Sequence, residues 1–200
     1  MSTAPTRRFT LEEYLTLEKS SVEKHEFYNG EIFAMAGGSP RHNAIGGNCF
    51  AALHGKLRGG SCQPFPSDQR IRISKAGIST YADASVFCDG LKTAPEDRHG
   101  ANNPRVIIEV LSPSTENYDR GQKFLFYQNL DSLQEYVLIS QHEPRIDHYL
   151  KQETGSWWLK IIVGIEETLP LTSIGVEIAL RDIYERVEFG PEIEEATKPT

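Results

Sequence analysis

One acid inside an apolar stretch, Glu109, constrains this chain more than any other residue. It lies in the run Val106–Leu111, whose other members are all aliphatic and which has proline near both ends. Such a run is typical of a buried central strand. Period two along a strand would place Glu109 on one face with Ile107 and Leu111. Because an unpaired buried carboxylate is very costly, we expect Glu109 to be neutralised, paired or bound to a metal ion.

A second embedded acid, Asp83, lies in the apolar segment Thr80–Phe87, which we expect to form another strand. If the carboxylates of Asp83 and Glu109 converge, they would repel each other when unpaired and would bind a hard divalent cation, Mg²⁺ or Mn²⁺ in its place. The backbone carbonyl of Val110 would add an oxygen ligand. The alternative is that Asp83 has only a structural role and is held by backbone amides or an arginine.

A lysine on the next predicted element, Lys123, is the third candidate. Residues 117–130 are expected to be helical, and Asp119, Lys123, Tyr127 and Leu130 would share one stripe facing the sheet. A partly desolvated lysine beside a metal would orient water or neutralise a phosphate in the transition state. An ordinary helix pair with Asp119, worth a few tenths of a kcal/mol, explains the spacing equally well.

The remaining patterns predict an α/β fold with a mixed sheet flanked by helices, an N-terminal hairpin and a C-terminal β extension. Asn29-Gly30 is a preferred hairpin turn. The expected helices cover residues 9–19, 39–58 and 178–186, the expected strands cover 25–28, 31–35, 68–74, 135–140, 145–150 and 157–163, and 89–103 is expected to be a polar loop.

The composition is that of an ordinary globular protein, and 200 residues suit one domain, expected over 9–186. We expect residues 1–8 to be disordered and 187–200 to form an acidic flexible tail. Neither a signal peptide nor a membrane span is predicted.

Three cysteines without CxxC spacing argue against a zinc site or a disulfide framework and predict a cytoplasmic protein. The net charge of −7 argues mildly against broad nucleic-acid affinity.

Seven segments of the chain resemble the Uma-type, restriction-endonuclease-like proteins, which belong to the PD-(D/E)XK nuclease superfamily. The similarity extends over about residues 9–186 and is most specific between Glu109 and Lys123. The matching segments are Phe9–Tyr14, His25–Ile32, Ser39–His42, Ser67–Arg72, Tyr81–Val86, Ile108–Thr115 and Asp119–Tyr127.

The resemblance implies a restriction-endonuclease-like core that cleaves DNA with Mg²⁺, commonly as a homodimer. Asp83 would be the motif's first acid and Glu109 its second. The lysine expected two residues later is replaced by Leu111, and Lys123 would supply it from the following helix. Glu26 is a further shared acid, and we include it with Asp83, Glu109 and Lys123 in the expected catalytic set.

Three more residues are candidates for substrate binding. His42 would contact phosphate or substrate, although a capping or partly buried histidine is the simpler interpretation. Arg70 and Arg72 would meet phosphates, or else form the solvated face of a strand. The alternative to an endonuclease is a binding or interaction protein on a nuclease-like scaffold with little or no catalysis.

Overall fold

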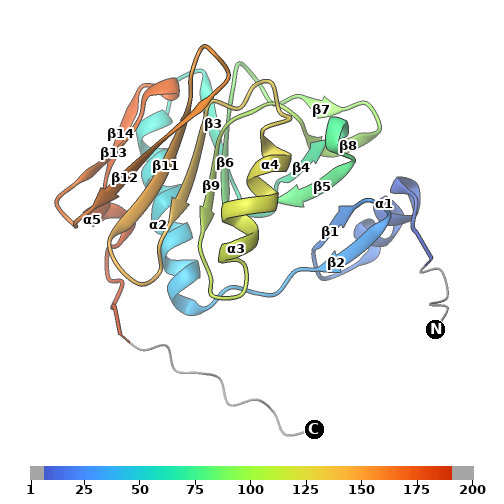
Figure 1. The fold of residues 1–200 in the computed structure, drawn as a ribbon, viewed down its shortest axis with the longest axis horizontal. Helices are drawn as coiled ribbons and strands as arrows, with labels where there is room; N and C mark the ends of the chain where they lie inside the picture. Colours follow the sequence, from blue (N-terminus) through green and yellow to red (C-terminus); the bar gives the residue numbers. More distant parts are fainter. Residues whose placement is uncertain (1–6, 191–200) are drawn as a thin grey trace, which may run out of the picture.

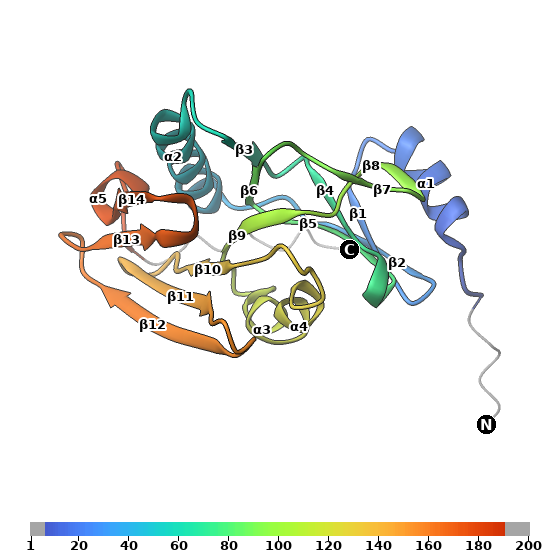
Figure 2. The same ribbon diagram turned by 90° about the horizontal axis from the view of Figure 1, so that it is seen from above.

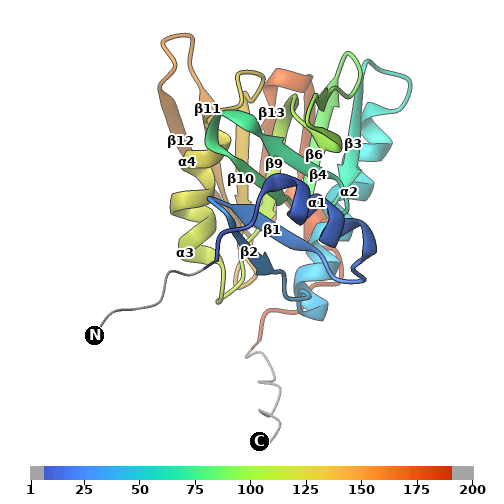
Figure 3. The same ribbon diagram turned by 90° about the vertical axis from the view of Figure 1, so that its right-hand side faces the viewer.

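Two six-stranded sheets form the framework of the protein in a computed structural model, which describes residues 7–190. Sheet A lies in front of sheet B in Figure 3. In spatial order, sheet A consists of β2 (Glu31–Ala34), β1 (His25–Tyr28), β5 (Ile78–Tyr81), β4 (Arg70–Ile73), β8 (Asp97–Ala101) and β7 (Thr93–Ala94). Sheet B consists of β12 (Trp157–Val163), β11 (Arg145–Lys151), β10 (Glu135–Ile139), β9 (Pro104–Val110), β6 (Ala84–Cys88) and β3 (Cys62–Pro66).

Helices cover both faces of sheet B, as expected for an α/β fold (Figures 1 and 2). The long helix α2 (Pro40–Leu57) lies on one face with α5 (Leu180–Ile183) and the hairpin of β13 (Thr168–Leu171) and β14 (Val176–Ala179). The short helices α3 (Glu116–Tyr118) and α4 (Phe124–Tyr127) lie on the other face, between the two sheets. Helix α1 (Leu11–Ser20) packs beside β1 of sheet A.

The central strand β9 faces two separate apolar cores. Val106, Ile108 and Val110 pack with α2 in one core, and Ile107 and Leu111 pack with α4 and sheet A in the other. Every residue from Val106 to Val110 is buried. Glu109 therefore lies among apolar neighbours on the α4 side, which confirms the predicted alternation.

Local signals in the sequence correctly predict three element boundaries. Thr10 caps α1 and exchanges both hydrogen bonds of a capping box with Glu13. Asn29 and Gly30 have φ values of 50° and 83°, the left-handed pair that a tight hairpin turn requires. Ser39 caps α2, with Pro40 in its first turn.

The helix predicted over residues 117–130 is present but contains a π-helical segment, Asp119–Lys123, between α3 and α4. Such segments are rare and are frequent at functional sites. Asp119, Lys123, Tyr127 and Leu130 are all buried, so the predicted inward stripe is confirmed.

Three predicted boundaries are wrong, because pairing with distant strands decides them. The segment Thr80–Phe87 is not one strand: β5 and β6 belong to different sheets, and Asp83 lies in the link between them. The expected polar loop 89–103 contains β7 and β8. The expected terminal helix 178–186 begins as β14, and only Leu180–Ile183 is helical.

The argument from cysteine spacing against disulfides is wrong for one pair of cysteines. Cys62 and Cys88 form a disulfide between β3 and β6, where they are directly opposed in register. The two cysteines meet only because β3 and β6 pair in antiparallel fashion. They are 26 residues apart in sequence, so no short cysteine motif predicts the bond. Cys49 is free and buried in α2.

Both chain ends continue beyond the described residues, so the predictions for 1–6 and 191–200 lie outside them. Arg8 already hydrogen-bonds Asn29 in the hairpin turn, and the Phe189 ring packs against Tyr184. Within residues 7–190, every helix is too short or too polar to cross a membrane.

Candidate active site

The buried ammonium of Lys123 is the centre of an acidic cluster between the two sheets. Its Nζ lies 2.9 Å from Glu109 Oε1, 3.5 Å from Asp119 Oδ1 and 3.9 Å from Glu26 Oε1. The Lys123 side chain is only 6% exposed, and each of the three acid side chains is at most 12% exposed. One cation thus faces three carboxylates that come from β9, the π-helical segment and β1.

Glu109 is held by two groups at the same oxygen. Tyr127 Oη donates a hydrogen bond of 2.9 Å to Oε1, the atom that also faces Lys123. No group within residues 7–190 donates a hydrogen bond to the other oxygen, Oε2. That oxygen keeps its lone pairs available to a ligand.

Hydroxyl groups hold Glu26 beside the cluster. Thr80 Oγ1 donates to Oε1, and Tyr118 Oη donates to Oε2 over 3.1 Å. Asp119 is fixed from its backbone, because Tyr136 Oη donates to its carbonyl over 2.8 Å. The positions of both acids are therefore defined by the packed aromatic core.

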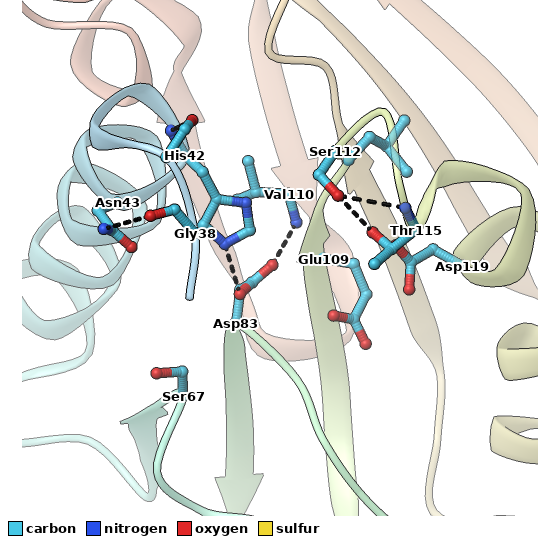
Figure 4. Close-up of polar contacts among 12 residues, drawn as sticks. Gly38, His42, Asn43, Ser67, Asp83, Glu109, Val110, Ser112, Thr115 and Asp119 are labelled. Atoms are coloured by element: carbon cyan, nitrogen blue, oxygen red, sulfur yellow. Dashed lines mark hydrogen bonds and ion pairs between the residues drawn. The ribbon is translucent and has the colours of Figure 1, made fainter. Parts of the chain in front are cut away.

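His42 joins the site through Asp83 (Figure 4). Its Nε2 lies 2.9 Å from Asp83 Oδ1, and the Val110 N–H donates to Asp83 Oδ2 over 2.7 Å. The Ser39 hydroxyl accepts a hydrogen bond from the backbone N–H of His42, so Ser39 and not His42 caps α2, while the alternative of a partly buried histidine is correct. The ring packs so closely on Gly38 that a Cβ there would lie 2.4 Å from His42 Cδ2.

Asp83 directly precedes β6, whose neighbour β9 carries Glu109, so the expectation of two acids within adjacent strands is correct for Glu109 and wrong for Asp83. Ala84 is opposite Ile108 in the antiparallel β6–β9 pair. Asp83, one residue before Ala84, therefore lies level with Glu109, one residue after Ile108. In Figure 4 both carboxylates project into the region between α2 and the helix that carries Asp119.

Burial and charge shift the pKa values of the cluster. Burial raises the pKa of Glu109 well above its ordinary value although Lys123 acts in the opposite direction, and burial also raises the pKa of Asp119. Burial by itself would lower the pKa of Lys123, but Glu109, Glu26 and Asp119 outweigh it and raise that pKa. The ammonium therefore stays charged, and Glu109 and Asp119 hold protons more tightly than usual.

Asp83 and His42 form an ion pair. Burial alone would raise the pKa of Asp83, yet the hydrogen bond and charge of His42 and the Val110 N–H bring it below its ordinary value. Burial alone would lower the pKa of His42, and the bond to Asp83 outweighs it. The expectation of two unpaired, mutually repelling acids is therefore wrong: Asp83 is paired with His42 and Glu109 with Lys123.

The donor set suits a hard cation. Carboxylate and carbonyl oxygens are the ligands that Mg²⁺ prefers. The N–H and C=O groups of one strand residue point toward the same neighbouring strand. Because the Val110 N–H donates to Asp83, the Val110 carbonyl points to the Asp83 side of β9 as well. In the part of the chain that the structure describes, no three His, Cys, Asp or Glu side chains are gathered as closely as metal ligands. Instead, Lys123 pairs with Glu109 and His42 pairs with Asp83.

Arg70 and Arg72 are not brought to this cluster. Arg70 makes two hydrogen bonds of 2.8 Å to Asp97, and Arg72 lies 3.1 Å from Glu96. Their role in substrate binding stays a prediction.

Sequence reasoning missed three members of the site, namely Asp119, Tyr118 and Tyr127. The sequence predicts Asp119 only as a helix partner of Lys123 and Tyr127 only as part of the stripe that faces the sheet. Their contacts with the site depend on strands and helices that are far apart in sequence. A buried stripe that mixes acid, lysine and tyrosine was the available signal.

Comparisons with known proteins agree with the fold. A family model described as "Uma2: Putative restriction endonuclease" matches residues 11–181. Two proteins of Synechocystis sp. (strain PCC 6803) match much of the chain. "Uncharacterized protein slr1290" is 39% identical over 189 residues, covering 93% of this chain and 96% of its own. "Uncharacterized protein sll1609" is 36% identical over 164 residues, covering 82% and 93%.

A solved structure supports the same architecture. The crystal structure of "a putative nuclease belonging to DUF820" from Anabaena variabilis superposes with a TM-score of 0.71 at 20% identity, covering 88% of this chain and 97% of that one. At this identity the likeness is evidence for the fold alone. The family match, the relatives and the arrangement of sheets and helices lead to one conclusion: the chain belongs to the Uma2 family and has a restriction-endonuclease-like fold.

Proposed function

We propose that this protein is an endonuclease that hydrolyses phosphodiester bonds of DNA with the help of Mg²⁺. One observation carries the proposal: Asp83, at the start of β6, lies level with Glu109 of the neighbouring strand β9, and the buried ammonium of Lys123 lies 2.9 Å from Glu109. Two acids and a lysine at one point are the groups that metal-assisted hydrolysis of a phosphodiester requires.

The residues present would hold the cation with oxygen atoms alone. Asp83, Glu109 through its free Oε2, and the Val110 carbonyl would be its ligands. When bound, a divalent cation supplies Lewis-acid polarisation of a phosphoryl oxygen and lowers the pKa of a bound water.

Lys123 would then act on the reacting groups. Its charge is maintained by the surrounding acids, and an ammonium in a water-poor site stabilises developing negative charge far more than one in bulk water. Glu26 and Tyr127 hold Lys123 and Glu109 in place. Asp119 adds a second negative neighbour that keeps the lysine protonated.

The description of the Uma2 family as a "putative restriction endonuclease" supports DNA as the substrate, and we propose in addition that the enzyme acts as a homodimer. A dimer with two such sites would cut both strands of a duplex. His42, Arg70 and Arg72 remain candidates for phosphate contact.

A cleavage assay tests the proposal. Purified protein is incubated with supercoiled plasmid, single-stranded DNA and RNA, each with Mg²⁺, with Mn²⁺ and with EDTA. We expect nicking or linearisation of DNA with either metal and none with EDTA. Glu109→Gln and Lys123→Met should abolish cleavage, whereas the exposed-site variant Asp131→Asn should cleave as wild type does. Wild-type protein inactive on every substrate would refute the proposal.

The second candidate is a binding protein on the same scaffold, and the closed ion pairs favour it. Lys123 and His42 already neutralise the acids, and the nearby Arg120 bonds to both Glu116 and Asp147. Because Glu109 and Asp83 already have partners in Lys123 and His42, the site does not need a metal ion to be stable. Nucleic-acid binding without cleavage, unaffected by Glu109→Gln, would favour this candidate.

A further inference from the structure

The free edge of sheet B carries an unusual strand. β12 is the terminal strand of the sheet (Figure 1), and four of its exposed residues are apolar. Trp158 is 68% exposed, Leu159 48%, Ile161 49% and Val163 56%. Lys160 is the one charged residue between Trp157 and Val163.

The other edges of the two large sheets are protected against pairing in ways that β12 is not. β3, at the opposite edge of sheet B, contains Pro64 and Pro66, which have no N–H to donate. In sheet A the edge strands are short: β7 has two residues and β2 has four. Proteins normally guard exposed edges with proline, charge or short length. β12 has seven residues, no proline and only Lys160 as a charged guard, and such a long apolar edge indicates an interface.

The backbone of β12 defines which groups face outward. Gly164 N–H donates to the Pro144 carbonyl over 2.9 Å, so even-numbered residues turn their backbone groups toward β11. Along a strand, the backbone N–H and C=O groups of successive residues point to opposite sides. The backbone groups of Leu159, Ile161 and Val163 therefore point away from β11, toward the free edge.

We propose that a second copy of this chain pairs with this edge, β12 against β12 in antiparallel register, with Ile161 on the two-fold axis. In this register Ile161 faces its own copy and Leu159 faces Val163 of the other copy. The three outward-facing backbone positions of each strand then exchange hydrogen bonds, and their side chains form one apolar layer across the axis. The two sheets B become one continuous sheet.

The sequence of the strand favours a second copy in this register. Shifting the axis to Lys160 would place two like charges directly opposite, which is destabilising. Centring on Ile161 places Lys160 opposite Ile162 instead. Leu159, Ile161 and Val163 of the two copies would lie side by side on one face of the joined sheet, and Trp158 of each copy would lie on the other face. The pairing therefore adds apolar contacts to the main-chain hydrogen bonds, as in other cases where a strand is added at a sheet edge.

Sedimentation and cross-linking test the proposal. Wild-type protein at micromolar concentration should sediment at twice the 22.5 kDa chain mass. Ile161→Lys should sediment as a monomer with an unchanged far-ultraviolet circular dichroism spectrum. Phe33→Lys is the matched control, because Phe33 is 46% exposed on the edge strand β2, and it should remain dimeric.

Cysteine substitution tests the register even if Ile161→Lys fails to fold. Opposed residues of a hydrogen-bonded pair have Cα atoms about 5.5 Å apart, within reach of a disulfide. Ile161→Cys should therefore cross-link two chains on oxidation. Leu159→Cys should not, since its own copy would lie about 13 Å away along the strand.

Three results would overturn the proposal: a monomeric wild type, a dimer unaffected by Ile161→Lys, or cross-linking through Leu159→Cys in preference to Ile161→Cys. If the chain's own residues 191–200 cover β12 instead, a monomer would show β12 amides that lose protection from hydrogen exchange when that segment is deleted. A monomer that still cleaves DNA would refute the interface and the proposed homodimer and would leave the proposed hydrolysis of DNA standing.

Discussion

At the scale of single residues, Tyr127 sets the position of the central acid. Its buried hydroxyl shares Glu109 Oε1 with Lys123, which leaves Oε2 for a ligand. We expect Tyr127→Phe to lose about 1.5–3 kcal/mol of stability, the usual cost of a hydrogen bond to a charged group. It should also weaken Mn²⁺ binding measured by calorimetry. Tyr14→Phe, which loses a buried bond to the His25 carbonyl, should destabilise without changing metal affinity. Equal metal affinity in both variants would contradict this role of Tyr127.

The ion pair of Asp97 with Arg70 makes stability depend on pH. Burial alone would raise the pKa of Asp97, but its bonds to Arg70 outweigh burial and lower that pKa. An acid with a depressed folded pKa stabilises the protein above its unfolded pKa, near 4, and this stability is lost as pH falls through the folded value.

Replacing Asp97 tests this linkage. Asp97→Asn should cost about 3 kcal/mol at pH 7, because it leaves a buried arginine without its partner. The difference from wild type in urea unfolding should shrink below pH 4. Asp68→Asn, whose partner Lys24 is at the surface, should cost under about 1 kcal/mol at either pH. A cost for Asp97→Asn that is the same at pH 3 and pH 7 would rule out the linkage.

At the scale of elements, the disulfide joins the edge strand β3 to β6. It closes a segment of 26 residues, for which chain entropy gives about 3–4 kcal/mol of stabilisation. Reduction should therefore lower the melting temperature by roughly 10 °C in a chain of this length. The Cys62→Ser, Cys88→Ser double variant should melt at the lower temperature with or without reductant. A wild-type melting temperature insensitive to reductant would show that strand pairing alone holds this edge.

At the scale of the whole molecule, metal binding should couple to folding. A cation that binds only the folded state adds RT ln(1 + [L]/Kd) to its stability. With Mg²⁺ or Mn²⁺ at about ten times Kd, we expect the melting temperature to rise by roughly 3–5 °C. Asp83→Ala should abolish the rise, and Asp131→Ala, an exposed acid paired with Lys75, should preserve it. An unchanged wild-type melting temperature at millimolar metal would count against the site.

Several features of the whole molecule can be predicted from local sequence patterns. The sequence alone determined the α/β class, the hairpin turn, the caps of α1 and α2, and the burial of Glu109 and Lys123. These features depend on periodicity and on contacts within a few residues, so the pattern of side chains is sufficient to predict them.

Only the tertiary structure decided which groups meet. The division of Thr80–Phe87 between two sheets, the bond from His42 to Asp83 and the disulfide of Cys62 with Cys88 all depend on which distant strands pair. Lys123 also faces Glu26, nearly a hundred residues away in sequence. No local pattern encodes such contacts, because the free energy that selects them comes from burying two cores at once.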